Sequence, residues 1–176
     1  MKNIFHPTKN ILDIGVGNGN ILVNIGKKLN INSNHLFGID VLNYSENKNF
    51  NYVQYNKNLI PLESNSIGLI LIMMVLHHTD EPKKVLMEAH RVLSDSGCII
   101  VRETDSYHKN LLEFNILIKY IFYEILLEIP IKITNNYLDK NKWEFLFKDV
   151  GFKYTKVKEN KLENDPFTSV YYILKK

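Results

Sequence analysis

Short apolar runs alternate along this chain with stretches in which apolar residues recur every three or four positions. The runs predict strands at residues 10–14, 35–41, 51–55, 67–75 and 98–102. The periodic stretches predict helices at 20–29 and 80–93, the second with Asp80 as N-cap and Pro82 in its first turn. Because 67–75 is almost continuously apolar, it is typical of a strand buried on both faces of a parallel sheet.

The C-terminal part continues the alternation less regularly. A turn is predicted at 94–97, a long helix over 111–128 before Pro130, and a short helix over 142–150 that ends at Gly151. Strands 152–158 and 168–174 follow. This order of elements indicates one α/β domain over 1–176, with a doubly wound, mostly parallel seven-stranded sheet and an antiparallel edge strand.

Residues 111–133 are the one stretch that could be mistaken for a membrane span. Charged side chains interrupt it every four to six residues, which a lipid-exposed helix does not tolerate. Glu113, Glu124 and Glu128 fall within about 60° of one another on a helical wheel, which predicts an amphipathic helix with a wide apolar face. That face either packs inside the domain or meets an acceptor, a second copy of the chain or another protein.

Length and composition limit the class of protein to which this chain can belong. With 176 residues and 45% hydrophobic content, the chain can build one compact core. Cys98 is the sole cysteine, so a disulfide scaffold and a cysteine-ligated zinc site are excluded, and the reducing cytoplasm is expected. The net charge of +3 is spread along the chain, which permits nucleic acid as a partner without indicating it. No metal site and no signal peptide are predicted.

The loop after the first predicted strand carries the clearest candidate chemistry. Residues 13–20 read Asp-Ile-Gly-Val-Gly-Asn-Gly-Asn, with glycine at alternate positions. Such glycines allow positive φ and close approach of a ligand, and the next helix presents unpaired N–H groups. An open α/β sheet binds its ligand beyond the carboxyl ends of its strands, beside this loop. The nicotinamide fingerprint needs a further glycine where Asn20 stands, which disfavours an oxidoreductase.

The spacing D-x-G-x-G-x-G resembles the first motif of the class I S-adenosylmethionine-dependent methyltransferases, whose sheet is Rossmann-like. The resemblance implies that Asp13 faces the cationic amino acid end of the cofactor. It also implies that the cofactor lies on the loop formed by Gly15, Val16, Gly17 and Gly19. An acid beside the loop suits a sulfonium cofactor, which has no phosphate to repel.

Further matches to this family follow in register. Asp40 stands where the family places a carboxylate that accepts both ribose hydroxyls, with Val41 beside it, although an acid there could also cap a helix. Asn56, followed by Lys57, replaces the acid that binds the adenine amine, and its amide oxygen can still accept that bond. Met73, near the end of the fourth predicted strand, is expected to contact the cofactor.

The stretches Val-Leu-His-His at 75–78 and Arg-Val-Leu-Ser-Asp-Ser-Gly at 91–97 are similar to the family's V-L-H-H and R-V-L-K-P-G-G. The resemblance places the cofactor half at 10–105 and an acceptor half with a closing hairpin at 106–176. The N-P-P-Y, Pro-Cys and Lys-Asp-Lys-Glu signatures of three nucleic-acid methylase groups are absent. The resemblance is therefore to the broad small-molecule-like branch of the family, which includes quinone, sterol and metabolite methylases and tRNA wobble-uridine carboxymethyl methylases.

The acceptor site is expected at the ends of the fourth and fifth strands. Methyl transfer is an in-line displacement, so a base is needed only where the acceptor carries a proton. His77 and His78 are the candidate bases, unless they only pack under the loop or cap the next helix. The predicted acceptor pocket consists of Glu103, Tyr107 and His108, with Met73, Met74, Arg102 and Asp105 nearby. Glu103 and Asp105 follow the fifth strand, where they are expected either to bind a cationic acceptor or to solvate a loop.

The predicted function is therefore methyl transfer from S-adenosylmethionine to an unidentified acceptor, either a small molecule or a group on RNA or protein. A non-catalytic methyltransferase-like partner subunit and a nicotinamide-dependent oxidoreductase are the alternatives. Members of the family that this chain resembles usually carry helices before the first strand that cover the cofactor, whereas nine residues precede that strand here, so the resemblance implies an open site. We expect the helix at 111–128, a second copy of the chain or a protein partner to cover it.

Overall fold

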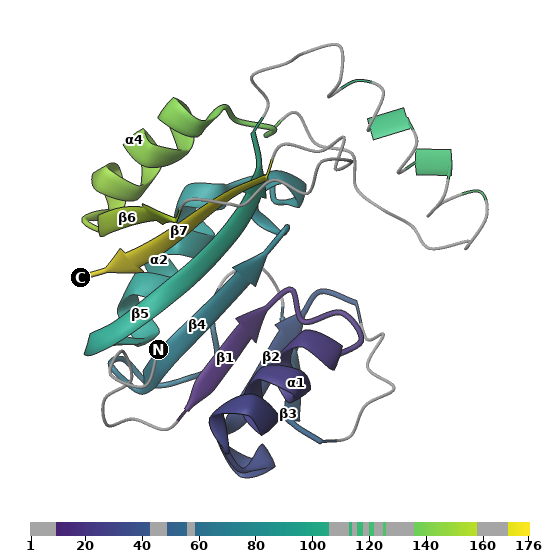
Figure 1. The fold of residues 1–176 in the computed structure, drawn as a ribbon, viewed down its shortest axis with the longest axis vertical. Coiled ribbons are helices and arrows are strands. Elements are labelled where there is room, and N and C mark those ends of the chain that lie inside the picture. Colours follow the sequence, from purple (N-terminus) through teal and green to yellow (C-terminus); the bar gives the residue numbers. More distant parts are fainter. Residues whose placement is uncertain are drawn as a thin grey trace.

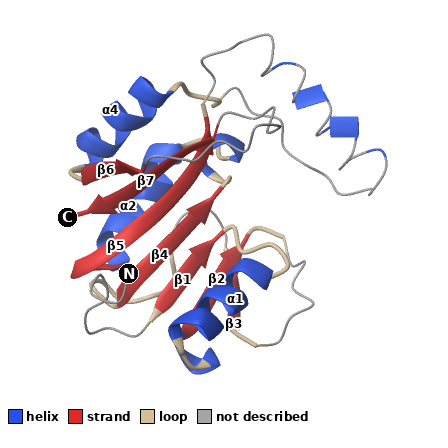
Figure 2. Ribbon diagram, viewed as in Figure 1, coloured by secondary structure: helices blue, strands red, loops and turns tan. Residues whose placement is uncertain are grey.

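The computed structural model describes residues 10–42, 49–55, 59–105, 136–157 and 169–176, together with six single residues, namely Glu113, Ile116, Leu117, Tyr120, Ile121 and Ile125. The strands are β1 (Ile11–Ile14), β2 (Leu36–Asp40), β3 (Asn51–Gln54), β4 (Ile67–Met73), β5 (Leu93–Thr104), β6 (Lys153–Val157) and β7 (Ser169–Lys175). The helices are α1 (Asn20–Leu29), α2 (Pro82–Val92) and α4 (Lys140–Val150), with short 3-10 turns η1 (Ser33–His35) and η2 (Leu76–His78). Figure 2 shows the strands side by side as one sheet, with the helices packed against it.

All seven strands form one sheet in the order β3-β2-β1-β4-β5-β7-β6. The pairs from β3 to β5 are parallel, whereas β7 runs antiparallel to both of its neighbours. The predicted fold class is confirmed, and its antiparallel pairing arises because β7 is inserted between β5 and β6. The carboxyl ends of β1, β2, β4 and β5 therefore meet at one edge of the sheet (Figure 1).

Helices cover the two faces of the sheet separately (Figure 1). On one face, α1 presents Leu22 and Val23 to β1 and β2 and keeps the bounds predicted from its apolar spacing. On the other face, α2 and α4 bury a larger cluster that includes Trp143 and Phe147. No helix among the described residues is long and apolar enough to cross a membrane.

One predicted boundary is wrong in a way that affects the site. The predicted turn at 94–97 lies within β5, where the register with β4 shifts between the Ile67–Leu93 and Leu69–Cys98 pairs. The extra residues form a bulge, so the chain stays in the sheet instead of leaving it. The strand also continues past the predicted end at 102, and this extension places Glu103 inside the sheet.

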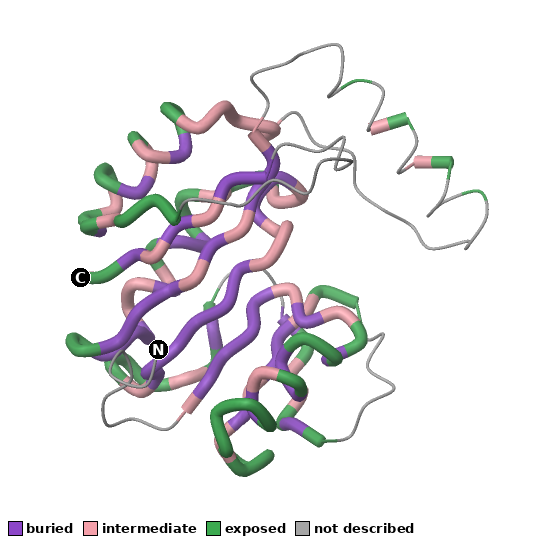
Figure 3. Tube along the Cα trace, in the orientation of Figure 1, coloured by how far each residue is buried: buried purple, intermediate pink, exposed green. Residues whose placement is uncertain are grey.

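The predicted helix at 111–128 lies largely outside the described residues. Its described members are assigned to helix and lie on the side of the sheet toward which β4 and β5 point (Figure 1). Leu117, Ile121 and Ile125 are 53%, 37% and 59% exposed. Figure 3 shows described parts of this segment as exposed. Their spacing of four residues places these three apolar side chains on one face of a helix.

Candidate active site

The loop between β1 and α1 has a shape that depends on glycine. Gly15, Gly17 and Gly19 have φ angles of 75°, 53° and 79°. A Cβ on Gly15 would clash with the side chain of Val75, and one on Gly19 would clash with the ring of Phe50. A Cβ on Gly17 would meet no described atom within 4 Å. Packing therefore requires the outer two glycines, whereas Gly17 borders open space that a ligand can enter.

Asp40 at the end of β2 is bonded directly to this loop. Its Oδ2 accepts the backbone N–H of Gly17 at 2.9 Å, and its Oδ1 accepts that of Leu42 at 3.3 Å. The carboxylate is half-buried and keeps further lone pairs. Asp40 therefore anchors the loop beside the open space at Gly17. The sequence did not indicate this contact, because 23 residues separate the two partners.

Asp13 lies in β1 with 2% of its surface exposed. Burial, together with the charge of the Asp40 carboxylate, raises the pKa of Asp13 to about 8. The buried carboxyl is therefore mostly protonated at neutral pH in the ligand-free protein. A cation placed beside it would favour the ionised form.

The structure brings two predicted site residues together in the interior. His77 and Glu103 are both fully buried, and the Nδ1 of His77 lies 2.6 Å from Oε2 of Glu103. The other oxygen, Oε1, accepts the backbone N–H groups of Val75 and Leu76 at 3.0 and 2.6 Å. Burial and the Glu103 carboxylate also raise the pKa of Tyr137, whose ring centroid lies 4.8 Å from that of His77. Glu103 thus fixes the turn that follows β4.

The other predicted residues are distributed around this pair. His78 is half-buried, and its ring centroid lies 4.0 Å from that of His77. Met73 is half-buried at the end of β4, and Val41 is 37% exposed beyond β2. Val16 is buried in the glycine loop. Four further predicted site residues lie outside the described residues: Asn56, Lys57, Tyr107 and His108.

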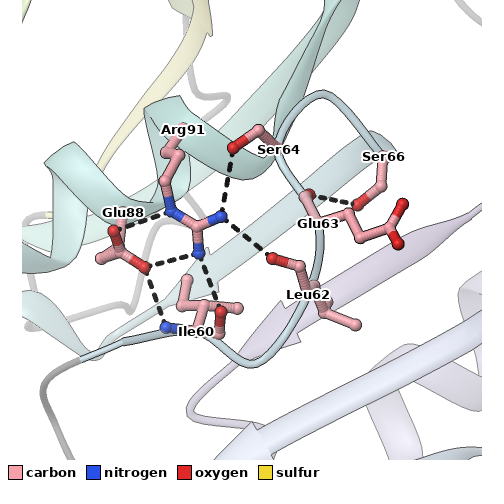
Figure 4. Close-up of polar contacts among 7 residues, drawn as sticks. All are labelled: Ile60, Leu62, Glu63, Ser64, Ser66, Glu88 and Arg91. Atoms are coloured by element: carbon pink, nitrogen blue, oxygen red, sulfur yellow. Dashed lines mark hydrogen bonds and ion pairs between the residues drawn. The ribbon is translucent and has the colours of Figure 1, made fainter.

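A clamp centred on Arg91 holds the segment before β4 (Figure 4). Its Nε and Nη2 donate to Glu88, and Nη2 also donates to the carbonyl of Ile60 at 2.8 Å. Its Nη1 donates to the carbonyl of Leu62 at 3.0 Å and to the Ser64 hydroxyl at 3.3 Å. The Arg91 guanidinium lowers the pKa of Glu88. The arginine of the R-V-L motif is therefore structural here, and the sequence reasoning missed this role because its partners lie in a different segment.

Three solved structures illustrate the similarity of this fold to known proteins. A methyltransferase in complex with the Trm112 methyltransferase activator of Haloferax volcanii is 15% identical, with a TM-score of 0.68 over 96% of this chain and 82% of that one. The YcgJ protein of Bacillus subtilis is 14% identical, with a TM-score of 0.70 over 94% and 91%. An S-adenosylmethionine-dependent methyltransferase of Aquifex aeolicus is 19% identical, with a TM-score of 0.66 over 98% and 86%. At these identities the likeness shows the fold.

The family itself is shown by a sequence profile. The profile of the methyltransferase-domain family matches residues 12–101, which run from β1 through most of β5. This match spans half of the chain and includes Asp13, Asp40 and the turn after β4. The chain belongs to this methyltransferase-domain family and is a class I S-adenosylmethionine-dependent methyltransferase, as its glycine motif implied.

Proposed function

We propose that the cofactor lies over Gly17, with its ribose at Asp40 and its amino acid end at Asp13, and that the methyl acceptor lies at the carboxyl ends of β4 and β5. The observation that carries this proposal is the carboxylate of Asp40, fixed by the Gly17 N–H beside the open face of the loop. Its remaining lone pairs suit two hydroxyl donors. The buried Asp13 suits an ammonium group, because a cation there would ionise it.

The remaining predicted cofactor residues keep their expected roles in this proposal. They are Gly15, Val16, Gly19, Val41, Asn56, Lys57 and Met73. The cofactor half is then 10–105, and 106–176 supplies the acceptor side and the closing strands of a single domain. When bound, the cofactor supplies an electrophilic methyl group on sulfur.

Asp40→Ala tests the ribose assignment. S-adenosylmethionine and S-adenosylhomocysteine should stabilise the wild-type protein in a thermal-shift assay, and NAD should not. Loss of the charged acceptor should weaken binding by about 1.5 to 3 kcal/mol in calorimetry. Asp95→Ala is the matched control, because the Asp95 side chain is 90% exposed, and it should bind normally. Unchanged affinity in Asp40→Ala would refute the ribose assignment.

For a protic acceptor, we propose that His78 is the base and that the buried pair beneath it acts as its support. His78 is half-buried and can reach a ligand, whereas His77 is enclosed and held through Nδ1 by Glu103. The imidazole of His78 would take the acceptor proton as the new bond to the methyl carbon forms. His77 and Glu103 would set the position of the turn that carries His78.

His78→Gln and His77→Gln separate these two roles. If the acceptor carries a titrating proton, the wild-type rate should rise with pH through a value near 6.5. His78→Gln should lose this dependence and about 100-fold in rate, measured as radiolabelled methyl transfer to fractionated lysate. His77→Gln should instead lower the melting temperature and keep the pH profile. If both variants keep the wild-type rate, catalysis is positional and the pair is structural.

A protein partner is a second element of the proposal. A similar structure is a complex with an activator protein, and Leu117, Ile121 and Ile125 expose an apolar stripe here. Single exposed apolar residues are normal on a protein surface, whereas a contiguous apolar stripe is typical of an interaction site. A second copy of this chain or an activator would cover it and the acceptor side together.

The triple change of Leu117, Ile121 and Ile125 to Ser tests this surface. The wild-type protein should bind an apolar-surface dye and should show a mass that rises with concentration in light scattering. The triple variant should lose most of both signals. Met87→Ser, at another exposed apolar position, is the control and should keep them. A strict monomer that binds S-adenosylmethionine at low micromolar concentration without binding the dye would contradict the open, partner-covered site.

A further inference from the structure

The chain contains two arginines, Arg91 and Arg102, and they differ in whether a carboxylate neutralises the guanidinium. Arg91 forms a paired clamp in which Glu88 neutralises its charge (Figure 4). Arg102 is half-buried and has no carboxylate partner among the described residues. Its Nε is buried and has no hydrogen-bond partner among the described residues. A buried cationic N–H in this state is uncommon in native proteins and is the kind of donor that a ligand completes.

Two side chains of β7 fix the position of the Arg102 guanidinium. Its Nη2 donates to the hydroxyl of Ser169 at 3.3 Å. Its central carbon lies 5.5 Å from the centroid of the Tyr171 ring. Ser169 is 7% exposed, so the bond is formed inside the structure and not on a flexible surface. The guanidinium is thus oriented in advance, while one of its donors stays unused.

The sheet register places Arg102 on the acceptor side of the site. Arg102 pairs with Met73 across β4 and β5. Asp13 is in register with Leu71, and Leu71 with Ile100, so Asp13 and Arg102 point to the same face of the sheet. Arg102 lies two strands away from Asp13 and one row nearer to the carboxyl ends. A ligand that extends from Asp13 past the end of β4 arrives at Arg102.

We infer that Arg102 is the anion site of the methyl acceptor and binds a carboxylate group on it. This inference rests on the proposed placement of the cofactor over Gly17. The guanidinium offers N–H donors in the plane that a carboxylate matches. Glu103, the acid expected to attract a cationic acceptor, faces the opposite side and is occupied by Val75, Leu76 and His77. Of these two neighbouring side chains of β5, the one that faces the acceptor is therefore the positive Arg102.

Nitrogen-15 NMR of the arginine side chains can test this site directly, because the chain has two Nε–H groups. Arg102→Lys removes one signal and so assigns both. The protein is saturated with S-adenosylhomocysteine and titrated with sodium acetate, with sodium chloride keeping the ionic strength constant. The Arg102 signal should move and saturate at millimolar acetate. The Arg91 signal should stay, because Glu88 already accepts from its Nε. Ser169→Ala should weaken the acetate effect several-fold.

Three results would overturn the inference. The first is an Arg102 signal that does not move with acetate, either with or without S-adenosylhomocysteine. S-adenosylhomocysteine alone could move it and block the acetate effect, which would assign Arg102 to the carboxylate of the cofactor. The Arg91 signal could move as much as that of Arg102, which would indicate non-specific binding. If S-adenosylhomocysteine moves no signal of the glycine loop, the proposed cofactor site fails, and the acetate titration of the ligand-free protein still decides whether Arg102 binds an anion.

Discussion

Replacing Asp13 with Asn should stabilise the ligand-free protein at pH 8 by about 3 to 5 kcal/mol. The reason is that burial and Asp40 raise the pKa of Asp13 to about 8, far above that of an aspartate in the unfolded chain. The folded protein therefore holds a proton that the unfolded chain has released. Asparagine has nearly the same shape and no proton to lose.

The sign of this effect defines a pH window. Between the unfolded pKa near 4 and the folded pKa of about 8, the folded state binds more protons, so the wild-type free energy of unfolding falls as pH rises. The slope contributed by Asp13 approaches about 1.4 kcal/mol per pH unit. Urea denaturation from pH 5 to 8.5 should show this slope in the wild type and its loss in Asp13→Asn.

The same substitution should damage cofactor binding. We expect the affinity for S-adenosylmethionine to fall by roughly 10- to 100-fold, because the ammonium group loses its charged partner. In the wild type, affinity should rise with pH toward 8 as Asp13 becomes ionised. Asp95→Asn is the matched control and should change neither stability nor affinity, since that side chain is exposed. A variant with wild-type slope and wild-type affinity would contradict both the burial argument and the cofactor placement.

Replacing Glu103 with Ala should cost about 3 to 5 kcal/mol of unfolding free energy. The change leaves the N–H groups of Val75 and Leu76 and the Nδ1 of His77 without their acceptor inside the protein. For a chain of this size, the melting temperature should fall by roughly 10 °C. Differential scanning calorimetry measures the loss.

A further variant separates the charge of Glu103 from its shape. Glu103→Gln keeps an oxygen for the two backbone donors but has no negative charge for His77, so it should lose less stability than the alanine variant. Glu63→Ala is the control, because the Glu63 residue is exposed. Equal melting temperatures for the wild type and Glu103→Ala would show that the buried pair does not hold the turn after β4.

The roles of neighbouring residues in β5 could be predicted only in part. The apolar run 98–102 identified the strand, and the rule that an open α/β sheet binds ligands beyond the carboxyl ends of its strands identified the end of this strand as part of a site. The sequence placed Glu103 in an acceptor pocket because the strand was expected to stop at 102. In the structure β5 continues to Thr104, so side chains alternate between faces and Glu103 joins Val101 in the core. The two residues by which β5 extends past its predicted end, Glu103 and Thr104, decided this assignment.

Local patterns predicted the glycine loop well, because positive φ and the strand-to-helix transition depend on neighbouring residues. The bond from Gly17 to Asp40 and the clamp of Arg91 on Ile60 and Leu62 could not be predicted in this way. These contacts join segments that are far apart in the sequence, and no local pattern of apolar and polar residues indicates which distant segments meet. They depend on the order of strands in the sheet, which the sequence pattern constrains only to a general class.

The place of β7 between β5 and β6 has a consequence for synthesis on the ribosome. The free edge of β5 has to wait for roughly 65 further residues, or on the order of 10 s of translation, before its partner strand emerges. During that interval β5 presents an unpaired, apolar edge to every other nascent chain nearby. Slower translation of this stretch would lengthen the exposure. Expression yield should therefore respond to codon choice after Thr104 and to chaperones that bind exposed strands, even where the finished protein is unchanged.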